Sequence, residues 1–588
     1  MFAAGVYLNP AVYQGRPVEH TATISKLLYY KDSLNATVSV HRNGEQLFLK
    51  VGGKTDASNG KDMWTQVLSA HIPLLLHPHP HSAVVIGLGS GVTLSRAGRH
   101  PLSTIHCAEI DPAVIEGSRF FAAYNDKIHD DPRVTIYQAD GRNFLLASPR
   151  TYDVIISEPS NPWMAGVGYL FTKEFYQLAT QRLAPGGIMC QWVQLYRIFP
   201  SDVKLMLKTF HDTFPYVSVW SSVPGDMLLV GSMEPHTTTL QALSERMREP
   251  KVRDSLAEIQ ITSPELLLEL FRLGNAEVEA LTSDVPFVHQ DDRPILEFHA
   301  PKALYANKVF QMNYQGLQRF AASPSVIAPD YRREAMGASF YDGAGVLREA
   351  RDEPERSVEV LEEAVRLDPQ STNAWLHLAR SALEAKQYVK GEAALHQVIA
   401  LDPNHVKAHT LLGRLHRRFG QVEAARSQYE SAARVRAPDG QLAGELGDFF
   451  ANQREFRWAA EWYRSAISQG RDSDVMVAAF GNASAEAGAW PDAMAAAQYG
   501  TRRFPADARF FFLMGRAFIA QGQEADATAW LARALELDAN QPEAYYQLGR
   551  IAAARGVTPK AVAWLRLALT YDPYHKESLQ LLHRLQRK

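Results

Sequence analysis

The stretch Val84-Val85-Ile86-Gly87-Leu88-Gly89-Ser90-Gly91 decides the fold of the N-terminal part of this chain. A short apolar run of this kind is typical of a buried strand, and it leads into a glycine-rich turn and then a helical pattern. Glycines permit a tight turn and let a ligand approach the backbone at the N-terminus of the helix. The stretch therefore predicts a strand, a ligand-binding loop at Gly87, Gly89, Ser90 and Gly91, and a helix.

Further apolar runs follow, separated from one another by stretches with a helical pattern. This alternation of strands and helices predicts an α/β, doubly wound, Rossmann-like sheet of buried parallel strands. A small β region precedes this sheet, because Asn43-Gly44 separates two strand-like runs and Asn-Gly is a strong hairpin signal. The predicted strands span residues 36–41, 46–51, 83–87, 104–109, 134–137, 153–157, 188–193 and 227–230.

Two carboxylates follow predicted strands at the edge of the sheet where ligands bind. Glu109 ends the second strand of the alternating series, 18 residues after Gly91. A carboxylate there can accept both ribose hydroxyls of a nucleoside. Asp140-Gly141 follows the third strand, where the carboxylate would meet an adenine amino group. The pattern predicts a nucleoside site at Glu109, Asp140 and Gly141; the alternative is a Rossmann-like domain that has lost its ligand.

The fourth strand ends in Ser157-Glu158-Pro159-Ser160-Asn161-Pro162-Trp163. The carboxylate of Glu158 would point into the same crevice, so it is the candidate general base or amine-binding anion. Two prolines stiffen the loop, and Trp163 offers a flat apolar wall. The alternative is that Glu158 only caps a loop.

The C-terminal third repeats. The repeated segments end at Pro369, Pro403, Pro438, Asp472, Pro505, Ala539 and Pro573, and the intervals between these ends are 34, 35, 34, 33, 34 and 34 residues. A 34-residue period with two amphipathic helices is the tetratricopeptide signature. It predicts a solenoid of about six repeats and a terminal helix over residues 341–588. Such repeats bind a partner protein or peptide; an intramolecular brace or a dimerisation arm is the alternative.

Length and composition limit the function classes. A chain of 588 residues is longer than one hydrophobic core usually organises, so we expect two or more domains. Its net charge of −3 provides no basic surface that would attract nucleic acid. The two cysteines, Cys107 and Cys190, lie in apolar runs, so we expect buried thiols and a reducing, cytoplasmic compartment. If a membrane region precedes Met1 in the natural protein, the location would be the cytoplasmic side of the membrane. The histidines lack metal-ligand spacing, so we expect no metal site.

The chain resembles the spermidine synthase (polyamine aminopropyltransferase) family from about residue 26 to 301, and within it the spermidine-synthase-like domains fused to bacterial membrane segments. The resemblance is carried by Asp56, Asp62, Gln66, His77-Pro78, residues 87–91, Glu109-Ile110-Asp111, Asp140-Gly141-Arg142, residues 152–156, residues 170–176, Pro185-Gly186-Gly187 and Asp291-Asp292-Arg293-Pro294.

This resemblance implies a decarboxylated S-adenosylmethionine donor and a small-molecule amine acceptor. Gln66 would line the nucleoside groove, Glu158 would take a proton from the attacking amine, and Asp56, Asp62, Asn161 and Trp163 would contact the substrate. For Asp56, a carboxylate that only supports a turn is the alternative. The chain has Ser90, Glu158 and Asn161 where the family carries aspartates, and Thr65 where it carries a tyrosine.

Three functions therefore remain open: an aminopropyltransferase, an S-adenosylmethionine-dependent methyltransferase on the same scaffold, and a degenerate nucleoside-binding scaffold that acts through its repeats. A homo-oligomer is compatible with each. We predict an N-terminal extension (1–25), a β region (26–80), a nucleoside-binding catalytic domain (81–300), a linker (301–340) and the repeat solenoid (341–588).

Overall fold

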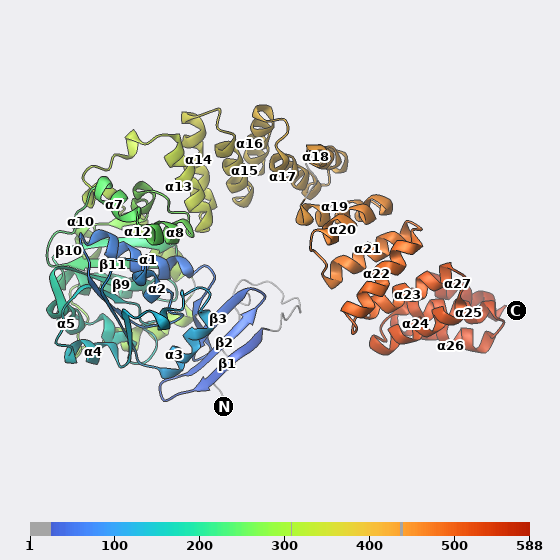
Figure 1. Ribbon diagram of the computed structural model, residues 1–588, viewed down its shortest axis with the longest axis horizontal. Coiled ribbons are helices and arrows are strands. Elements are labelled where there is room, and N and C mark those ends of the chain that lie inside the picture. Colours follow the sequence, from blue (N-terminus) through green and yellow to red (C-terminus); the bar gives the residue numbers. More distant parts are fainter. Residues whose placement is uncertain (1–24, 307, 436–438, 588) are drawn as a thin grey trace. The chain divides into compact units, whose positions relative to one another are not determined.

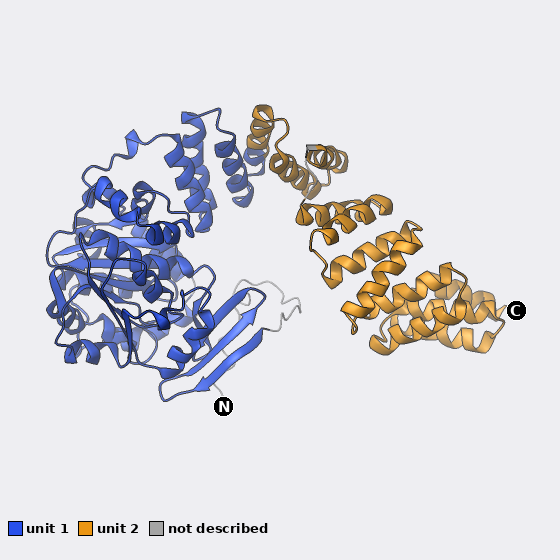
Figure 2. Ribbon diagram, viewed as in Figure 1, with its two compact units in different colours: residues 1–391 blue, residues 392–588 orange. Residues whose placement is uncertain are grey.

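The computed structural model describes residues 25–306, 308–435 and 439–587. The predicted N-terminal extension, apart from its last residue, and the repeat end at Pro438 therefore lie outside the described residues. The chain divides into two compact units, residues 1–391 and residues 392–588 (Figure 2). The first unit contains both sheets and the first repeat helices, and the second contains the remaining repeats (Figure 1).

A four-stranded antiparallel sheet begins the first unit, in the order β1-β2-β3-β4. The Asn-Gly signal predicts its central hairpin correctly, although β2 continues to Asn43 and the turn lies at Gly44-Glu45. Val38, Val40, Leu47 and Leu49 point from this sheet into a core shared with the large sheet. The strands are β1 (Lys26–Asp32), β2 (Thr37–Asn43), β3 (Gln46–Val51) and β4 (Lys54–Ser58).

The large sheet has eight strands in the order β12-β10-β11-β9-β8-β5-β6-β7. Its strands are β5 (Ser82–Ile86), β6 (Thr104–Glu109), β7 (Val134–Gln138), β8 (Tyr152–Ser157), β9 (Leu183–Gln194), β10 (Tyr216–Val223), β11 (Asp226–Ser232) and β12 (Phe271–Leu273). Strands β5 to β9 pair in parallel, which confirms the Rossmann-like prediction. Strand β11 was predicted among the parallel strands and is antiparallel to β9 and β10. Its turn from β10 is too short for the crossover that a parallel pair needs.

Both faces of the large sheet are covered, as its apolar strands predict. Along β9, Ile188 and Cys190 join a core on one face, whereas Met189 and Val193 join a core on the other. The helices of this part are α1 (Met63–Leu76), α2 (Val92–Gly98), α3 (Pro112–Ser118), α4 (Gly141–Ala147), α5 (Lys173–Arg182), α6 (Pro200–Thr213), α7 (Leu240–Met247), α8 (Pro250–Ala257), α9 (Pro264–Leu268), α10 (Asn275–Thr282), α11 (Ile295–His299) and α12 (Val309–Gln318). Cys107 and Cys190 are buried free thiols.

Helix pairs of the predicted period fill the rest of the chain. They are α13 (Ala338–Ala350), α14 (Pro354–Leu367), α15 (Thr372–Glu384), α16 (Tyr388–Leu401), α17 (Val406–Arg418), α18 (Val422–Val435), α19 (Gly440–Asn452), α20 (Phe456–Ser468), α21 (Asp474–Glu486), α22 (Trp490–Arg503), α23 (Ala508–Ala520), α24 (Glu524–Leu537), α25 (Pro542–Ala554) and α26 (Thr558–Tyr571), followed by α27 (Lys576–Gln586). Small residues bring paired helices together: a Cβ at Gly413 would lie 2.8 Å from Tyr429, and one at Gly549 would lie 2.9 Å from Leu565.

Ion pairs and hydrogen bonds of buried side chains connect the first repeat helices to the large sheet. Glu269, only 4% exposed, accepts hydrogen bonds from Arg333 and from Arg348 of α13. Arg351, at the end of α13, donates to the backbone oxygens of Ser221 and Ser222 on β10, at 3.1 Å each. The first unit therefore continues past residue 340, the predicted end of the linker.

Within the part of the chain that the structure describes, no helix is both long enough and apolar enough to cross a bilayer.

Candidate functional site

A cavity of about 980 Å³ opens at the carboxyl ends of β5, β6 and β8, and strand β4 and the start of α1 also line it. Its described lining includes seven acidic side chains and two basic ones. One of the basic residues, Arg142, is already paired with Asp291 at 2.8 Å. The cavity therefore favours a ligand that carries positive charge.

The glycine loop after β5 forms the floor of the cavity. Gly87 and Gly89 line it with φ of 90° and 52°, in the left-handed region that favours glycine. A Cβ on Gly87 would overlap the carbonyl oxygen of Glu158, so only glycine lets β5 and β8 end this close together. Gly91, predicted to contact the ligand, instead precedes α2 and packs against Asn125, behind the lining.

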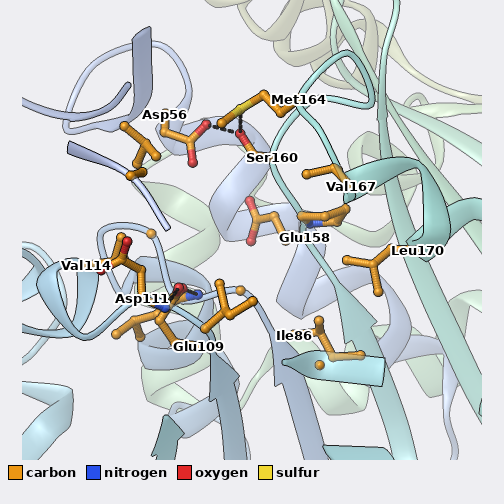
Figure 3. A pocket seen from close by; sticks show the side chains of 18 of the residues that line it. Asp56, Ile86, Glu109, Asp111, Val114, Glu158, Ser160, Met164, Val167 and Leu170 are labelled. Carbon is orange, nitrogen blue, oxygen red and sulfur yellow. Dashed lines mark hydrogen bonds between the residues drawn. The ribbon is translucent and has the colours of Figure 1, made fainter. Parts of the chain in front are cut away.

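Glu109 ends β6 at the edge of the cavity, as predicted, and is 7% exposed. Its carboxylate accepts the backbone N–H of Leu88 and of Asp111, each at 2.9 Å. Burial nevertheless raises the pKa of Glu109 to about 7. The two backbone bonds hold the carboxylate in one orientation, ready to accept further donors from a ligand (Figure 3).

Asp140 and Gly141 also line the cavity, where the sequence predicts the adenine site. The Asp140 side chain caps α4 by accepting the N–H of Asn143 at 2.8 Å. This capping bond fixes the side chain at the cavity edge. Gly141 packs directly on Ile86, leaving no room there for a larger residue.

Glu158 lies at the end of β8 and points into the cavity between β5 and the loop that carries Met164 (Figure 3). The hydroxyl of Thr93 donates to one of its carboxylate oxygens. Burial raises the pKa of Glu158 to about 7, and the charges of Asp226, Asp62 and Asp56 add to this rise. A carboxylate with this pKa exchanges a proton near neutral pH, as a general base must.

Asp62, Gln66 and Ser90 form a hydrogen-bonded group beside the glycine loop. Asp62 accepts the N–H of Ser58 at 2.5 Å and the side-chain amide of Gln66 at 3.1 Å. The hydroxyl of Ser90 donates to Gln66. Asp62 and Gln66 line the cavity, but Ser90, predicted to contact the donor, is fully buried behind them. Its role in the structure is to orient Gln66.

Asp56, Asn161 and Trp163 were predicted to contact the substrate, and the structure gathers them around the ammonium group of Lys54. Lys54 Nζ lies 3.0 Å from Asp56, donates to the side-chain oxygen of Asn161, and sits 5.8 Å from the centre of the Trp163 ring. Asp56 lines the cavity, together with Lys54; Asn161 and Trp163 lie behind. A carboxylate, an amide oxygen and an aromatic face are the partners that an organic cation also prefers.

Among the charged residues that line the cavity, Lys54 and Asp226 carried no predicted role. Lys54 directly follows Gly52-Gly53, a turn signal, and begins β4. Asp226 begins β11, far along the chain from the motifs, and its carboxylate accepts the hydroxyl of Thr65 at 2.8 Å. The only local signal was an acidic residue after Pro224-Gly225, at the start of an apolar run.

Among the described residues, no three histidine, cysteine, aspartate or glutamate side chains are grouped so that they could hold a metal ion.

Family comparisons agree with this geometry. Residues 64–236 match the model of the spermine/spermidine synthase domain. The chain carries a spermine/spermidine synthase domain. Tetratricopeptide repeat models match residues 341–406, 382–446 and 479–542. The predicted combination of a synthase domain with tetratricopeptide repeats is thereby confirmed.

Individual relatives are similar to part of the chain. A spermidine synthase of Dictyostelium discoideum is 33% identical over 178 residues, which cover 30% of this chain and 62% of that protein. A polyamine aminopropyltransferase of Thermotoga petrophila is 28% identical over 221 residues, covering 37% and 75%. A crystal structure of spermidine synthase with the transition-state analogue AdoDATO is 26% identical, with a TM-score of 0.33, covering 36% of this chain and 74% of that one. The chain thus spans less than two thirds of the Dictyostelium relative.

Proposed function

We propose that this protein is an aminopropyltransferase, which moves the aminopropyl group of decarboxylated S-adenosylmethionine to an amine. The observation that carries the proposal is the placement of Glu109 and Glu158 at two strand ends of one acidic cavity within a synthase domain. Both the sulfonium donor and a protonated amine are cations, so an acidic cavity suits both substrates.

The donor would lie over the glycine loop with its nucleoside between β6 and α4. Glu109 would accept the ribose hydroxyls, because backbone bonds already orient its carboxylate. Asp140 would meet the adenine amino group, and Gln66 would line the groove. Gly87 and Gly89 let the ligand approach the backbone closely.

Glu158 would act on the acceptor. A free alkylamine is protonated at neutral pH, and a protonated nitrogen has no lone pair with which to attack. Glu158 would take that proton, and the nitrogen would attack the methylene carbon next to the sulfonium. The new C–N bond forms as the C–S bond breaks, with its electron pair staying on sulfur. The products are the aminopropylated amine and neutral methylthioadenosine, and the proton leaves from Glu158 to solvent.

Calorimetry with methylthioadenosine, together with turnover assays using decarboxylated and intact S-adenosylmethionine, tests this function. We expect methylthioadenosine to bind, and we expect Glu109→Gln to weaken it about 10- to 100-fold, because one charge-assisted partner of the ribose is lost. Glu116→Gln, an exposed carboxylate of α3, is the control. If wild-type protein binds none of the three nucleosides, the proposed function is wrong.

A methyltransferase is the second candidate, and the ammonium group of Lys54 inside the cavity is the observation that favours it. Intact S-adenosylmethionine keeps a carboxylate, which a lysine can pair with, whereas the decarboxylated donor has only cationic groups.

Lys54→Met separates the two candidates. For an aminopropyltransferase, removing this cation is expected to lower KM for an amine acceptor about 3- to 10-fold, because a competing positive charge leaves the site. For a methyltransferase, the same substitution would weaken S-adenosylmethionine instead. Steady-state kinetics with each donor measure the difference, and Lys50→Met, on the neighbouring strand β3 and outside the cavity lining, is the control.

The repeats suggest a protein or peptide partner, and a homo-oligomer is compatible with the cavity. We place the reaction in a reducing, cytoplasmic compartment, which the two buried free thiols support.

A further inference from the structure

A β-bulge lies at the end of β10, just before the turn that leads to Asp226 in the cavity wall. The pairing of β10 with β11 shifts register between Ser221 and Val223, so Ser222 is an extra residue on β10. An extra residue disrupts the ladder of backbone hydrogen bonds locally, and the buried polar groups around it need other partners.

Arg351, at the C-terminal end of the first repeat helix, supplies such partners. Its Nε donates to the carbonyl oxygen of Ser222 and its Nη2 to that of Ser221, at 3.1 Å each. Nη2 also donates to the hydroxyl of Ser221 at 2.8 Å. Only 3% of Arg351 is exposed. The planar guanidinium group presents several donors in a fixed geometry, so one side chain holds both residues of the bulge.

Glu353 holds the guanidinium group of Arg351 in place. Its carboxylate lies 3.2 Å from Nη1 of Arg351 and accepts hydrogen bonds from the hydroxyl of Tyr314 in α12 and from Arg356 of α14. Burial acts to raise the pKa of Glu353, but the charge of Arg351 and the hydrogen bond from Tyr314 outweigh burial and lower this pKa to about 2. Glu353 is therefore ionised at neutral pH and neutralises Arg351.

Two buried hydroxyl groups connect the bulge to the cavity. Thr65 of α1 donates its single hydroxyl hydrogen to Oδ2 of Asp226 at 2.8 Å. The hydroxyl of Ser222 lies 2.9 Å from that of Thr65 and must therefore be the donor of their shared hydrogen bond. Ser222 is fully buried and Thr65 is 4% exposed, so no solvent replaces these bonds. The backbone position that Arg351 fixes at Ser222 thus sets the start of a hydroxyl chain that ends at Asp226.

We propose that Arg351 is a positioning residue of the synthase cavity, although it belongs to the repeat array. It holds the bulge and, through the hydroxyl groups of Ser222 and Thr65, orients the carboxylate of Asp226 in the cavity wall. The first repeat is then a structural part of the reaction centre. The proposal rests on the proposed aminopropyltransferase function where turnover is used to measure it.

Arg351→Lys in the full-length protein tests this role, because lysine keeps the positive charge beside Glu353 but lacks the fork that reaches both carbonyl groups. We expect KM for 1,4-diaminobutane to rise about 3- to 10-fold, the size of one displaced hydrogen bond, with kcat within about 3-fold. KM for decarboxylated S-adenosylmethionine should stay within about 2-fold, because the proposed donor contacts lie at other strand ends. Arg348→Lys is the matched control: it makes the same change on the same helix, but Arg348 donates to Glu269 and not to β10, so all three constants should stay within about 2-fold.

Ser222→Ala shows whether the effect passes through the hydroxyl chain, because it removes the hydroxyl and keeps both carbonyl groups. It should raise KM for the diamine by a similar factor. Combined with Arg351→Lys, it should raise KM by less than the product of the two factors, because both changes break the same chain. A wild-type KM in Arg351→Lys, an equal rise in Arg348→Lys, or factors that simply multiply in the double variant would overturn the positioning role.

If the wild-type protein transfers no aminopropyl group, the proposed function fails, and hydrogen exchange decides the inference. Arg351→Lys should then accelerate amide exchange about 3- to 10-fold in residues 222–228, the bulge, the turn and the start of β11. Arg348→Lys should accelerate exchange in α9 and α13 instead. Unchanged exchange in residues 222–228 of Arg351→Lys, or equal acceleration there by both variants, would show that Arg351 does not hold the cavity wall.

Discussion

Replacing Glu158 with glutamine is expected to lower kcat about 10²- to 10⁴-fold, the usual contribution of a general base, with methylthioadenosine affinity changed less than about 2-fold. Glutamine keeps the size of the side chain and can still accept the hydroxyl of Thr93, but it cannot take a proton. In the proposed binding mode the nucleoside contacts Glu109 and Asp140 at other strand ends, so its affinity is expected not to depend on position 158. Single-turnover rates and calorimetry measure the two quantities separately.

The pH dependence of the turnover rate, compared between the wild-type protein and Glu158→Gln, tests the role of Glu158 independently. Burial, with the charges of Asp226, Asp62 and Asp56, raises the pKa of Glu158 to about 7. A general base acts in its deprotonated form, so the wild-type rate at saturating donor should fall as the pH drops below about 7. The residual rate of Glu158→Gln should not show this fall. A cationic acceptor bound nearby would move the midpoint below 7, because it favours the ionised carboxylate.

Glu45→Gln, in the exposed turn between β2 and β3, is the matched control and should leave both profiles unchanged. A Glu158→Gln protein with the wild-type rate would remove Glu158 from the reaction. A parallel loss of methylthioadenosine affinity would instead assign Glu158 to donor binding.

Replacing Glu269 with alanine is expected to lower the free energy of unfolding of the first unit by about 3–5 kcal/mol, the range measured when one partner of a buried ion pair is removed. Glu269 is 4% exposed and accepts hydrogen bonds from Arg333, from Arg348 at 2.7 Å and from Tyr331 at 3.1 Å. Without the carboxylate, the guanidinium group of Arg348, whose side chain is only 11% exposed, loses its neutralising partner.

Urea unfolding measures this change, and hydrogen exchange locates it. Exchange should accelerate in α9 and α13 first, because Glu269 lies at the end of α9 and accepts a hydrogen bond from Arg348 of α13. Glu334→Ala, an exposed residue of the same region, should change stability by less than about 0.5 kcal/mol. Unchanged exchange in α13 after Glu269→Ala would mean that the first repeat helices hold their place without this ion cluster.

Much of the fold could be predicted from the sequence because the relevant signals are local. The run into Gly87 and Gly89 predicts β5 and its loop, and the 34-residue period predicts the helix pairs. Strands β1, β4, β10 and β12 were missed; β12 has only three residues, and β1 and β4 lie at the edges of a small sheet. Their pairing depends on partners elsewhere in the chain, which a local pattern does not contain.

The residues of the candidate site also fall into two groups, those that local patterns predict and those that depend on distant parts of the chain. Glu109, Asp140 and Glu158 each follow a parallel strand, and the carboxyl ends of such strands meet at one edge of the sheet. Their placement around one cavity was therefore predictable, although their roles stay a prediction. Lys54 and Asp226 reach the cavity from antiparallel strands of two different sheets, and no motif links them to the glycine loop.

The Rossmann-like sheet with acidic strand ends and the tetratricopeptide array could be predicted from the order of the amino acids alone, because hydrophobic period, glycine turns and repeat length are patterns within single stretches of the chain. Which charges meet in the cavity is visible only in the folded chain: Lys54 is bound by Asp56 and Asn161, and Asp226 accepts the hydroxyl of Thr65. The contacts of Lys54 with Asn161 and of Thr65 with Asp226 join residues more than a hundred positions apart, and their energies depend on distance and burial that only the folded chain defines.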